Sequence, residues 1–258
     1  MKILLTNDDG ITGQGLITLA DYLRKDHEVC VVAPSANRSG ASSSITMNKK
    51  LLLNKLGDSL YALDGSPVDC VVSAMRGDYL PFKPDLLISG INADGNIGTD
   101  IVYSGTCGAA RQAAIYGLPS IAVSLERNRK ENEAPFKFPP LADFIAKNLE
   151  NLIALCLKDR NIKEGEPCKY FLNVNAPSAD SYQGVKFASI SFRDYRDHVC
   201  LVEEDGRTYS LCTGGKSILS LGDCNCDASL VEQGYVTLSL LHTEPFSAVV
   251  NENLQWIF

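Results

Sequence analysis

Short apolar runs alternate with segments of helical periodicity through the first half of the chain. Residues 29–33 are almost continuously apolar, as strands buried on both faces of a parallel sheet tend to be. Leu16, Leu19 and Leu23 recur at the spacing of one helical face. The expected strands are residues 2–7, 29–33, 51–53, 60–63, 85–89 and 120–125. This alternating order predicts an α/β fold with a doubly wound, mostly parallel sheet and right-handed crossovers.

Local signals mark where two of the helices begin. Ser66 suits the N-cap and Pro67 the first position of a helix that runs to about Met75. A glycine-rich loop is expected from Gly90 to Tyr103. Ser104-Gly105-Thr106 then begins a helix that ends near residue 116.

The second half of the chain loses the strict alternation after residue 126. Residues 127–140 are polar and contain prolines, which indicates a connection, and a long helix is expected over 140–157. A strand is expected over 170–174. Beyond it helical patterns fade, and two strand-like runs flank the turn sequence Glu204-Asp205-Gly206, which predicts a hairpin. A last strand is expected at 234–241.

The length of 258 residues allows one large α/β domain. We expect a single domain over 1–258, with a core of about 1–184 and a C-terminal hairpin region of about 185–258. That region has apolar strands but few helices to cover them. Because uncovered strand edges associate unless they are paired, we expect it to mediate oligomerisation.

Composition narrows the classes of function. A net charge of −7 argues against a general nucleic-acid binder, which needs a basic surface. The sequence has no apolar stretch near the roughly 20 residues of a membrane span, and no signal-peptide pattern, so we expect a cytoplasmic protein without a membrane partner. Nine cysteines cannot all pair within the chain, and Cys224-Asn225-Cys226 lacks a second pair at zinc-site spacing. We interpret these two as reduced loop thiols.

Two adjacent carboxylates, Asp8 and Asp9, follow the first expected strand. In an open parallel sheet this strand-to-helix turn lies at the carboxyl edge, where ligands bind. Adjacent carboxylates repel, and a hard divalent cation such as Mg²⁺, Mn²⁺ or Ca²⁺ relieves that repulsion. The alternative is a solvated turn, since Asp, Asn and Gly all favour turns.

Polar loops follow three of the expected strands, at residues 7–10, 35–44 and 89–106. A doubly wound sheet brings such loops together, and each carries oxygen ligands or phosphate-binding groups. The helix that begins at Ser104 offers an anion site, with simple helix capping as the alternative role of its first residues. Histidine is absent from these loops, which argues against a zinc site and a His-based triad. Ser39 as a nucleophile lacks a base, and the P-loop and dinucleotide-binding motifs are missing.

These motifs together resemble the SurE family of survival-protein nucleotidases, which are metal-dependent phosphatases acting on nucleoside monophosphates. The matching segments are Asn7-Asp8-Asp9-Gly10, Ala33 to Ser42, Asp64-Gly65-Ser66-Pro67, Ser89-Gly90-Ile91-Asn92 and Tyr103-Ser104-Gly105-Thr106. The likeness is strong over residues 1–125 and looser afterwards. It implies a Rossmann-like core and a homodimer or homotetramer that exchanges C-terminal elements. Asp94 departs from the family pattern, and we expect its carboxylate to face solvent rather than to tighten metal binding.

The resemblance also implies a set of site residues. The metal ligands fall on Asp8, Asp9, Ser39 and Asn92, for one divalent ion, Mg²⁺ or Mn²⁺. Asp8 and Asp9 are the expected catalytic residues. The expected phosphate-binding residues are Asn96, Ser104, Gly105 and Thr106.

We therefore expect a phosphomonoester hydrolase that releases phosphate from nucleoside 5′-monophosphates, with 3′-monophosphates and short polyphosphate as open questions. Bulk at Gly105 is expected to block the approach of phosphate to the backbone. The alternative is a nucleotide- or phosphate-binding protein without turnover. A glycosyltransferase or a deacetylase with an acidic metal site is a further rival, although a deacetylase would normally use histidine ligands.

Overall fold

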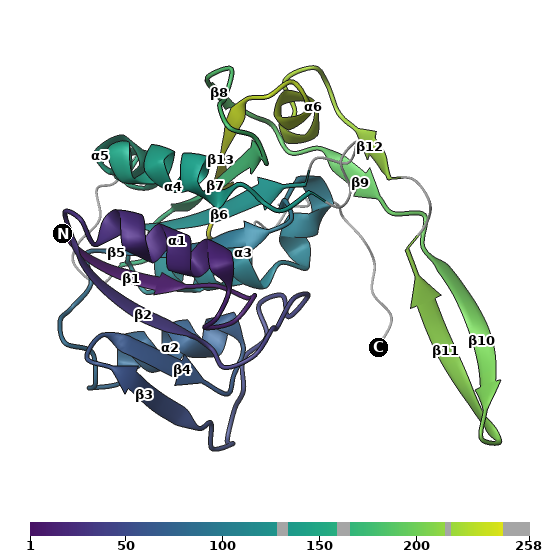
Figure 1. The fold of residues 1–258 in the computed structure, drawn as a ribbon, viewed down its shortest axis with the longest axis horizontal. Coiled ribbons are helices and arrows are strands. Elements are labelled where there is room, and N and C mark those ends of the chain that lie inside the picture. The colour runs from purple at the N-terminus through teal and green to yellow at the C-terminus, as the bar shows by residue number, and fades with distance from the viewer. Residues whose placement is uncertain (128–133, 159–165, 215–217, 245–258) are drawn as a thin grey trace, which may run out of the picture.

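The structure, a computed structural model, describes residues 1–127, 134–158, 166–214 and 218–244. A nine-stranded sheet runs through its centre (Figure 1). From one edge to the other its strands are β3 (Leu53–Gly57), β4 (Leu60–Leu63), β2 (Glu28–Pro34), β1 (Lys2–Thr6), β5 (Leu86–Ala93), β6 (Ser120–Glu126), β7 (Tyr170–Pro177), β13 (Val236–His242) and β8 (Val185–Phe187). The predicted α/β fold with a mostly parallel, doubly wound sheet is confirmed.

The order of the strands reverses beside β1. The chain passes from β1 to β2 on one side and later returns to β5 on the other, and both neighbours are parallel to β1. In such sheets the loops at the carboxyl ends of the two central strands separate and leave a crevice. β3 pairs antiparallel with β4, and β13 pairs antiparallel with β7. The candidate loops therefore follow the strands that border the switch point.

Helices cover both faces of the sheet (Figure 1). One face packs α1 (Gln14–Leu23), α4 (Phe138–Lys147) and α5 (Leu149–Cys156), and the other packs α2 (Pro67–Arg76) and α3 (Gly105–Ile115). Successive residues of β1 supply the two cores, Ile3 and Leu5 on one face and Leu4 on the other, because side chains alternate along a strand. No helix in the described parts of the chain is both long and apolar enough to cross a bilayer.

Two helix starts lie where the sequence predicts them. Ser66 caps α2: its hydroxyl accepts a hydrogen bond from the Asp69 amide at 3.0 Å, and the Asp69 carboxylate accepts one from the Ser66 amide at 2.9 Å. Pro67 takes the first helical position. Ser104 caps α3 in the same way by accepting from the Cys107 amide at 3.0 Å.

β5 is longer than predicted. The strand continues past Ser89 to Ala93, where the sequence suggested a glycine-rich loop, and Asn92 and Ala93 pair with Ser124 and Leu125 of β6 after a register shift. Asn92 therefore lies near the carboxyl end of strand β5, within the sheet, rather than in a free loop. A short 3₁₀ helix, η1 (Gly98–Val102), then leads to α3.

Three other elements differ from the sequence prediction. The long helix expected over 140–157 is two helices, α4 and α5, which meet at Asn148, where the side-chain amide donates to the Phe144 carbonyl at 2.8 Å. The strand expected at 51–53 is β3, which begins at Leu53. The six-residue helix α6 (Asp227–Glu232) is too short to leave a clear periodic signal.

The C-terminal part divides between the sheet and a projecting hairpin. β10 (His198–Glu204) and β11 (Arg207–Thr213) form the predicted antiparallel hairpin, which extends away from the rest of the molecule (Figure 1). β9 (Phe192–Asp194) pairs with β12 (Leu219–Leu221) near its base. β8 and β13 belong to the main sheet. The expected C-terminal region from 185 onwards thus contributes both to the core and to the projection.

Candidate active site

Backbone hydrogen bonds tie the three polar loops together at the carboxyl edge of the sheet. The Arg38 amide donates to the Asp8 carbonyl at 2.7 Å, which joins the second loop to the first. The Ser42 amide donates to the Tyr103 carbonyl at 3.0 Å, which joins the second loop to the third. The predicted convergence of these loops is therefore observed.

The first loop is held in shape by Asn7 and Gly10. The Asn7 side chain donates to the Gly10 carbonyl at 2.9 Å and accepts from the Gly10 amide at 3.2 Å. Gly10 has a φ of +96°, and a Cβ there would lie 3.0 Å from the carbonyl carbon of Ala36. Because a larger residue would be strained and crowded, glycine is required for this turn. The turn fixes the direction in which Asp8 and Asp9 leave the strand.

Asp8 is buried at the N-terminus of α3. Its carboxylate accepts a hydrogen bond from the Thr106 hydroxyl at 2.8 Å. Burial raises the pKa of Asp8, while the Thr106 hydroxyl and the amides of Thr106 and Gly105 act in the opposite direction. The N-terminal turn of α3, expected as an anion site, therefore orients a carboxylate of the protein itself.

Asp9 lies beside Asp8 and is partly buried. Its carboxylate accepts from the Ala93 amide at 3.1 Å. The pKa of Asp9 is raised to about 6: burial is the main cause, the Ala93 amide acts against it, and the negative charges of Asp8 and Asp94 add to it. Among the described residues no lysine, arginine or histidine forms an ion pair with Asp8 or Asp9. Two carboxylates held together in this way favour the binding of a cation.

The side-chain amide of Asn92 is held through its nitrogen. The Asn92 side-chain nitrogen donates to the Asp94 carbonyl at 2.6 Å, so the side-chain oxygen is left on the other side of the amide plane. Ser39 is exposed, and its loop is shaped by the bond from its amide to the Asn37 side chain at 2.9 Å. Asn92 and Ser39 thus offer neutral oxygen donors near the two carboxylates.

A hollow of about 320 Å³ opens over these groups. It brings together five of the residues singled out from the sequence: Asp8, Ser39, Asn92, Asn96 and Ser104. Thr106 lies behind Asp8 and is fully buried. Of the predicted phosphate-binding residues, Ser104 therefore lines the hollow while it caps α3, and Thr106 contacts Asp8.

Gly105 lies against Asp8 rather than against open space. A Cβ built on it would lie 3.0 Å from the Asp8 Cβ and 3.0 Å from the Pro67 Cγ. Any side chain at Gly105 would therefore press on a candidate metal ligand. This contact gives a physical reason for glycine that differs from the expected one, which was access of phosphate to the backbone.

Asn96 is anchored on several sides. Its side-chain nitrogen donates to the Ser124 hydroxyl at 2.7 Å, and its amide donates to the Asn175 side chain at 2.9 Å. Its carbonyl accepts from the side chains of Asn173 at 2.9 Å and Asn175 at 3.1 Å. This buried amide cluster fixes the floor of the hollow.

The structure adds residues that sequence reasoning did not assign. Asp100, Tyr103 and Tyr195 also line the hollow. Tyr103 falls within a recognised segment, yet nothing in the pattern gave it a role, and Tyr195 is remote in sequence. Asp94 is at the rim with a side chain that is 62% exposed and lies 3.4 Å from Arg127 Nε. The expectation that the Asp94 carboxylate faces solvent is confirmed.

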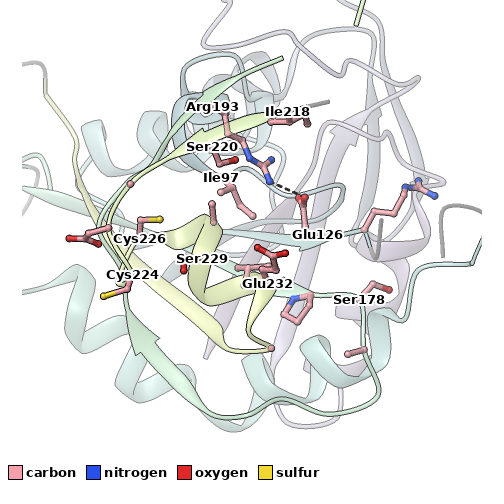
Figure 2. A pocket seen from close by; sticks show the side chains of 18 residues that line it. Ile97, Glu126, Ser178, Arg193, Ile218, Ser220, Cys224, Cys226, Ser229 and Glu232 are labelled. Atoms are coloured by element: carbon pink, nitrogen blue, oxygen red, sulfur yellow. Dashed lines mark hydrogen bonds and ion pairs between the residues drawn. The ribbon is translucent and has the colours of Figure 1, made fainter. Parts of the chain in front are cut away.

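An ion-pair network separates this hollow from a larger one. Arg193 donates to Asp100 at 2.8 Å and to Glu126 at 2.9 Å, and its side chain is only 6% exposed. Beyond the Arg193–Glu126 pair lies a hollow of about 850 Å³, bordered by α6 and by Cys224 and Cys226 (Figure 2). Asp8 lines the smaller hollow together with Ser39 and Asn92, so we assign the chemistry there despite the difference in volume.

The donor set at the smaller hollow suits a hard cation. Within the described ranges no three residues of the types His, Cys, Asp and Glu cluster to bind a metal. A cation beside Asp8 and Asp9 would therefore need the neutral oxygens of Ser39 and Asn92. Such an all-oxygen set fits Mg²⁺ or Mn²⁺ and does not fit zinc.

Fold and site together define a doubly wound α/β protein with an acidic, oxygen-rich site at the switch point of its sheet. Comparison with known proteins narrows this class further. The model of the family described as "Survival protein SurE" matches residues 3–197, and the chain belongs to that family.

Several relatives carry the same name. The chain is 38% identical over 251 residues to the 5′-nucleotidase SurE of Thermoanaerobacter sp. (strain X514), covering 94% of this chain and 92% of the relative. It is 37% identical to the 5′-nucleotidase SurE of Campylobacter lari, covering 92% and 91%. The crystal structure of the SurE protein from Aquifex aeolicus superposes with a TM-score of 0.75 at 30% identity, covering 95% of this chain and 94% of that one.

Proposed function

We propose that the protein is a metal-dependent phosphomonoester hydrolase that releases phosphate from nucleoside 5′-monophosphates. Membership of a family whose relatives are named 5′-nucleotidases supports enzymatic activity of this class. The observation that carries the proposal is the pair Asp8 and Asp9, the first buried and the second partly buried, without a cationic partner among the described residues. Asp8 lines a hollow together with the neutral oxygen donors Ser39 and Asn92.

Asp8, Asp9, Ser39 and Asn92 would hold one Mg²⁺ or Mn²⁺. A divalent ion at this position would neutralise phosphate charge and lower the pKa of a bound water. The protein's own groups prepare the site: Thr106 orients the Asp8 carboxylate, and the Asp94 carbonyl orients the Asn92 amide. Neutral ligands leave residual positive charge available for the phosphate.

The phosphate contacts are proposed from the other side of the hollow. The Ser104 hydroxyl and the N-terminal turn of α3, which begins with Gly105 and Thr106, suit an anion because this end of the helix carries a partial positive charge. Asn96 lines the same hollow. One of the two carboxylates would also orient the attacking water, and each is itself held by a hydrogen bond, Asp8 by Thr106 and Asp9 by Ala93.

The test is release of inorganic phosphate from 5′-AMP with Mn²⁺ or Mg²⁺, with and without a chelator. We expect activity that is lost with chelator and restored by excess metal. Parallel assays with 3′-AMP and tripolyphosphate decide whether the substrate range includes 3′-monophosphates and short polyphosphate. Binding of AMP without release of phosphate under all metal conditions would contradict the proposal and would favour a binding protein.

We also propose that the protein is a homodimer or homotetramer assembled through its C-terminal region. The β10–β11 hairpin exposes apolar side chains that a partner would cover, among them Leu201 at 72% exposure. All nine cysteines are free thiols, which suits a reducing compartment and supports the proposed cytoplasmic location.

A further inference from the structure

Two tyrosine rings border the hollow that contains Asp8 and Asn92. Tyr103 follows η1 and is 67% exposed, and Tyr195 follows β9 and is 38% exposed. They come from segments far apart in the chain, and each presents apolar surface beside a strongly polar site. Neither ring is needed to hold a metal or a phosphate.

Tyr195 is fixed in place through its hydroxyl. This hydroxyl donates a hydrogen bond to the Asp100 carboxylate, and the bond lowers the pKa of Asp100 against the larger, opposite effect of burial. Asp100 in turn accepts from Arg193 at 2.8 Å. Arg193 also donates to Glu126 at 2.9 Å (Figure 2). Because the network is largely buried, the ring of Tyr195 is held at the wall of the hollow before any ligand binds.

Tyr103 is held through its backbone instead. Its carbonyl accepts from the Ser42 amide at 3.0 Å, and the neighbouring Val102 carbonyl accepts from the Ser42 hydroxyl at 2.7 Å. The main chain is therefore anchored to the second loop while the ring remains exposed. A ring placed in this way can adjust to a flat group that enters the hollow.

A nucleoside monophosphate combines a phosphate with an aromatic base, and this hollow offers both a polar end and aromatic rings. Its phosphate suits the N-terminal end of α3 and a cation held by Asp8, and its base is a flat aromatic ring that stacks on tyrosine faces. A sugar phosphate without a base would use only the polar end. A hollow of about 320 Å³ is at the lower end of the range for small-molecule sites.

We propose that Tyr195 and Tyr103 form the base-binding wall of this site, and that Arg193 is a positioning residue that sets Tyr195 through Asp100. The inference deepens the proposed function and rests on it. It predicts that the protein selects nucleotides over base-free phosphate esters by contacts at these two rings, apart from any contact to phosphate.

The test compares 5′-AMP with ribose 5-phosphate, which carries the same ester and sugar without the base. For Tyr195→Ala and for Tyr103→Ala we expect kcat/KM for 5′-AMP to fall about tenfold, mainly through KM, with ribose 5-phosphate unchanged. Phe187→Ala is the matched control, because Phe187 is 66% exposed on β8 and does not line the hollow. That control should leave both substrates unaffected.

Two further variants separate the ring from its support. Tyr195→Phe keeps the stacking face and removes the hydroxyl, so we expect a smaller loss than with Tyr195→Ala. Arg193→Lys keeps the charge but cannot donate to both carboxylates with the same geometry. We expect it to raise KM for 5′-AMP while kcat and the kinetics of ribose 5-phosphate stay near wild type.

The outcomes are distinct. Equal losses for 5′-AMP and ribose 5-phosphate in the tyrosine variants would overturn the base-binding wall and leave the hydrolase proposal intact. If the wild type hydrolysed neither substrate, the proposed function would fail. Calorimetry of 5′-AMP and of ribose 5-phosphate would then test the base-binding wall without turnover. Equal affinity for 5′-AMP in the wild type and in Tyr195→Ala would overturn the wall.

Discussion

The crevice beside Asp8 buries polar side chains, whereas the β10–β11 hairpin exposes apolar ones, and both reverse the usual distribution in a folded protein. In the crevice, charged and amide side chains are buried and held by hydrogen bonds from distant segments. In the hairpin, apolar side chains such as Val199 and Leu201 lie in the open. Buried carboxylates lack compensating charge, and exposed apolar side chains lack cover. We therefore expect each region to be completed by something added, a cation in the crevice and a second protein surface on the hairpin.

The largest expected effect comes from removing one carboxylate of the candidate metal site in the crevice. Asp8→Asn keeps an oxygen that can accept from the Thr106 hydroxyl, but it removes one of the two charges that would hold the metal. We expect turnover of 5′-AMP to fall by about 10²–10³-fold while circular dichroism stays that of the wild type. The control is Asp94→Asn, which removes an exposed carboxylate at the rim. Near-full activity in Asp8→Asn would show that the metal site is elsewhere.

A second substitution tests the hairpin side. Leu201→Asp places a charge on an exposed apolar position of β10, and we expect the dissociation constant of the oligomer to rise about thirtyfold, equivalent to about 2 kcal/mol for one leucine. Multi-angle light scattering over a concentration series measures this shift. Met47→Asp, at a position 66% exposed outside the hairpin, should leave assembly unchanged. A wild-type protein that is monomeric at micromolar concentration would contradict the assignment.

The two regions also differ in how far the sequence could predict them. Apolar runs located β1, β2 and β6, and the polar residues after β1 and β5 were therefore expected to meet. The pairing of Asn92 and Ala93 with β6, which lengthens β5, depends on a register shift that local patterns do not encode. The same holds for Tyr195 and Asp100, because their link passes through a hydrogen bond between segments far apart in the chain.

For the hairpin, the local sequence predicts the strands themselves but not their surroundings. Its turn sequence predicted β10 and β11 with nearly correct limits, since hairpin formation is local. The described parts of the chain leave its apolar side chains exposed, and the local sequence does not indicate what would cover them. Short elements such as α6 left no periodic signal, and the break between α4 and α5 rests on one side-chain hydrogen bond of Asn148.

A third prediction tests the close packing of Gly105 against Asp8. Gly105→Ala adds a Cβ that would lie 3.0 Å from the Asp8 Cβ, so either the carboxylate or α3 must shift. We expect Mn²⁺ affinity and kcat/KM for 5′-AMP to fall together, each by about tenfold, or roughly 1.4 kcal/mol. Gly57→Ala is the control, because its nearest contact would be an ordinary 3.6 Å to Leu60. Unchanged Mn²⁺ affinity with impaired kinetics would instead favour a direct block of phosphate.

The smallest expected effect is on stability without metal. The pKa of Asp9 is raised to about 6, chiefly by burial, so the neutral carboxyl is favoured in the folded protein. The stability that this group contributes is fully present below about pH 4 and is lost as pH rises through about 6. Asp9→Asn removes that loss and can still accept from the Ala93 amide. Because Asp9 is only partly buried, we expect a gain of about 1 kcal/mol, or about 2–4 °C in Tm, at pH 7.5 in chelator, and a smaller gain at pH 4.5. Thermal unfolding at the two pH values measures it. An Asp9→Asn protein that is less stable than the wild type in chelator would mean that the two carboxylates do not strain the metal-free fold.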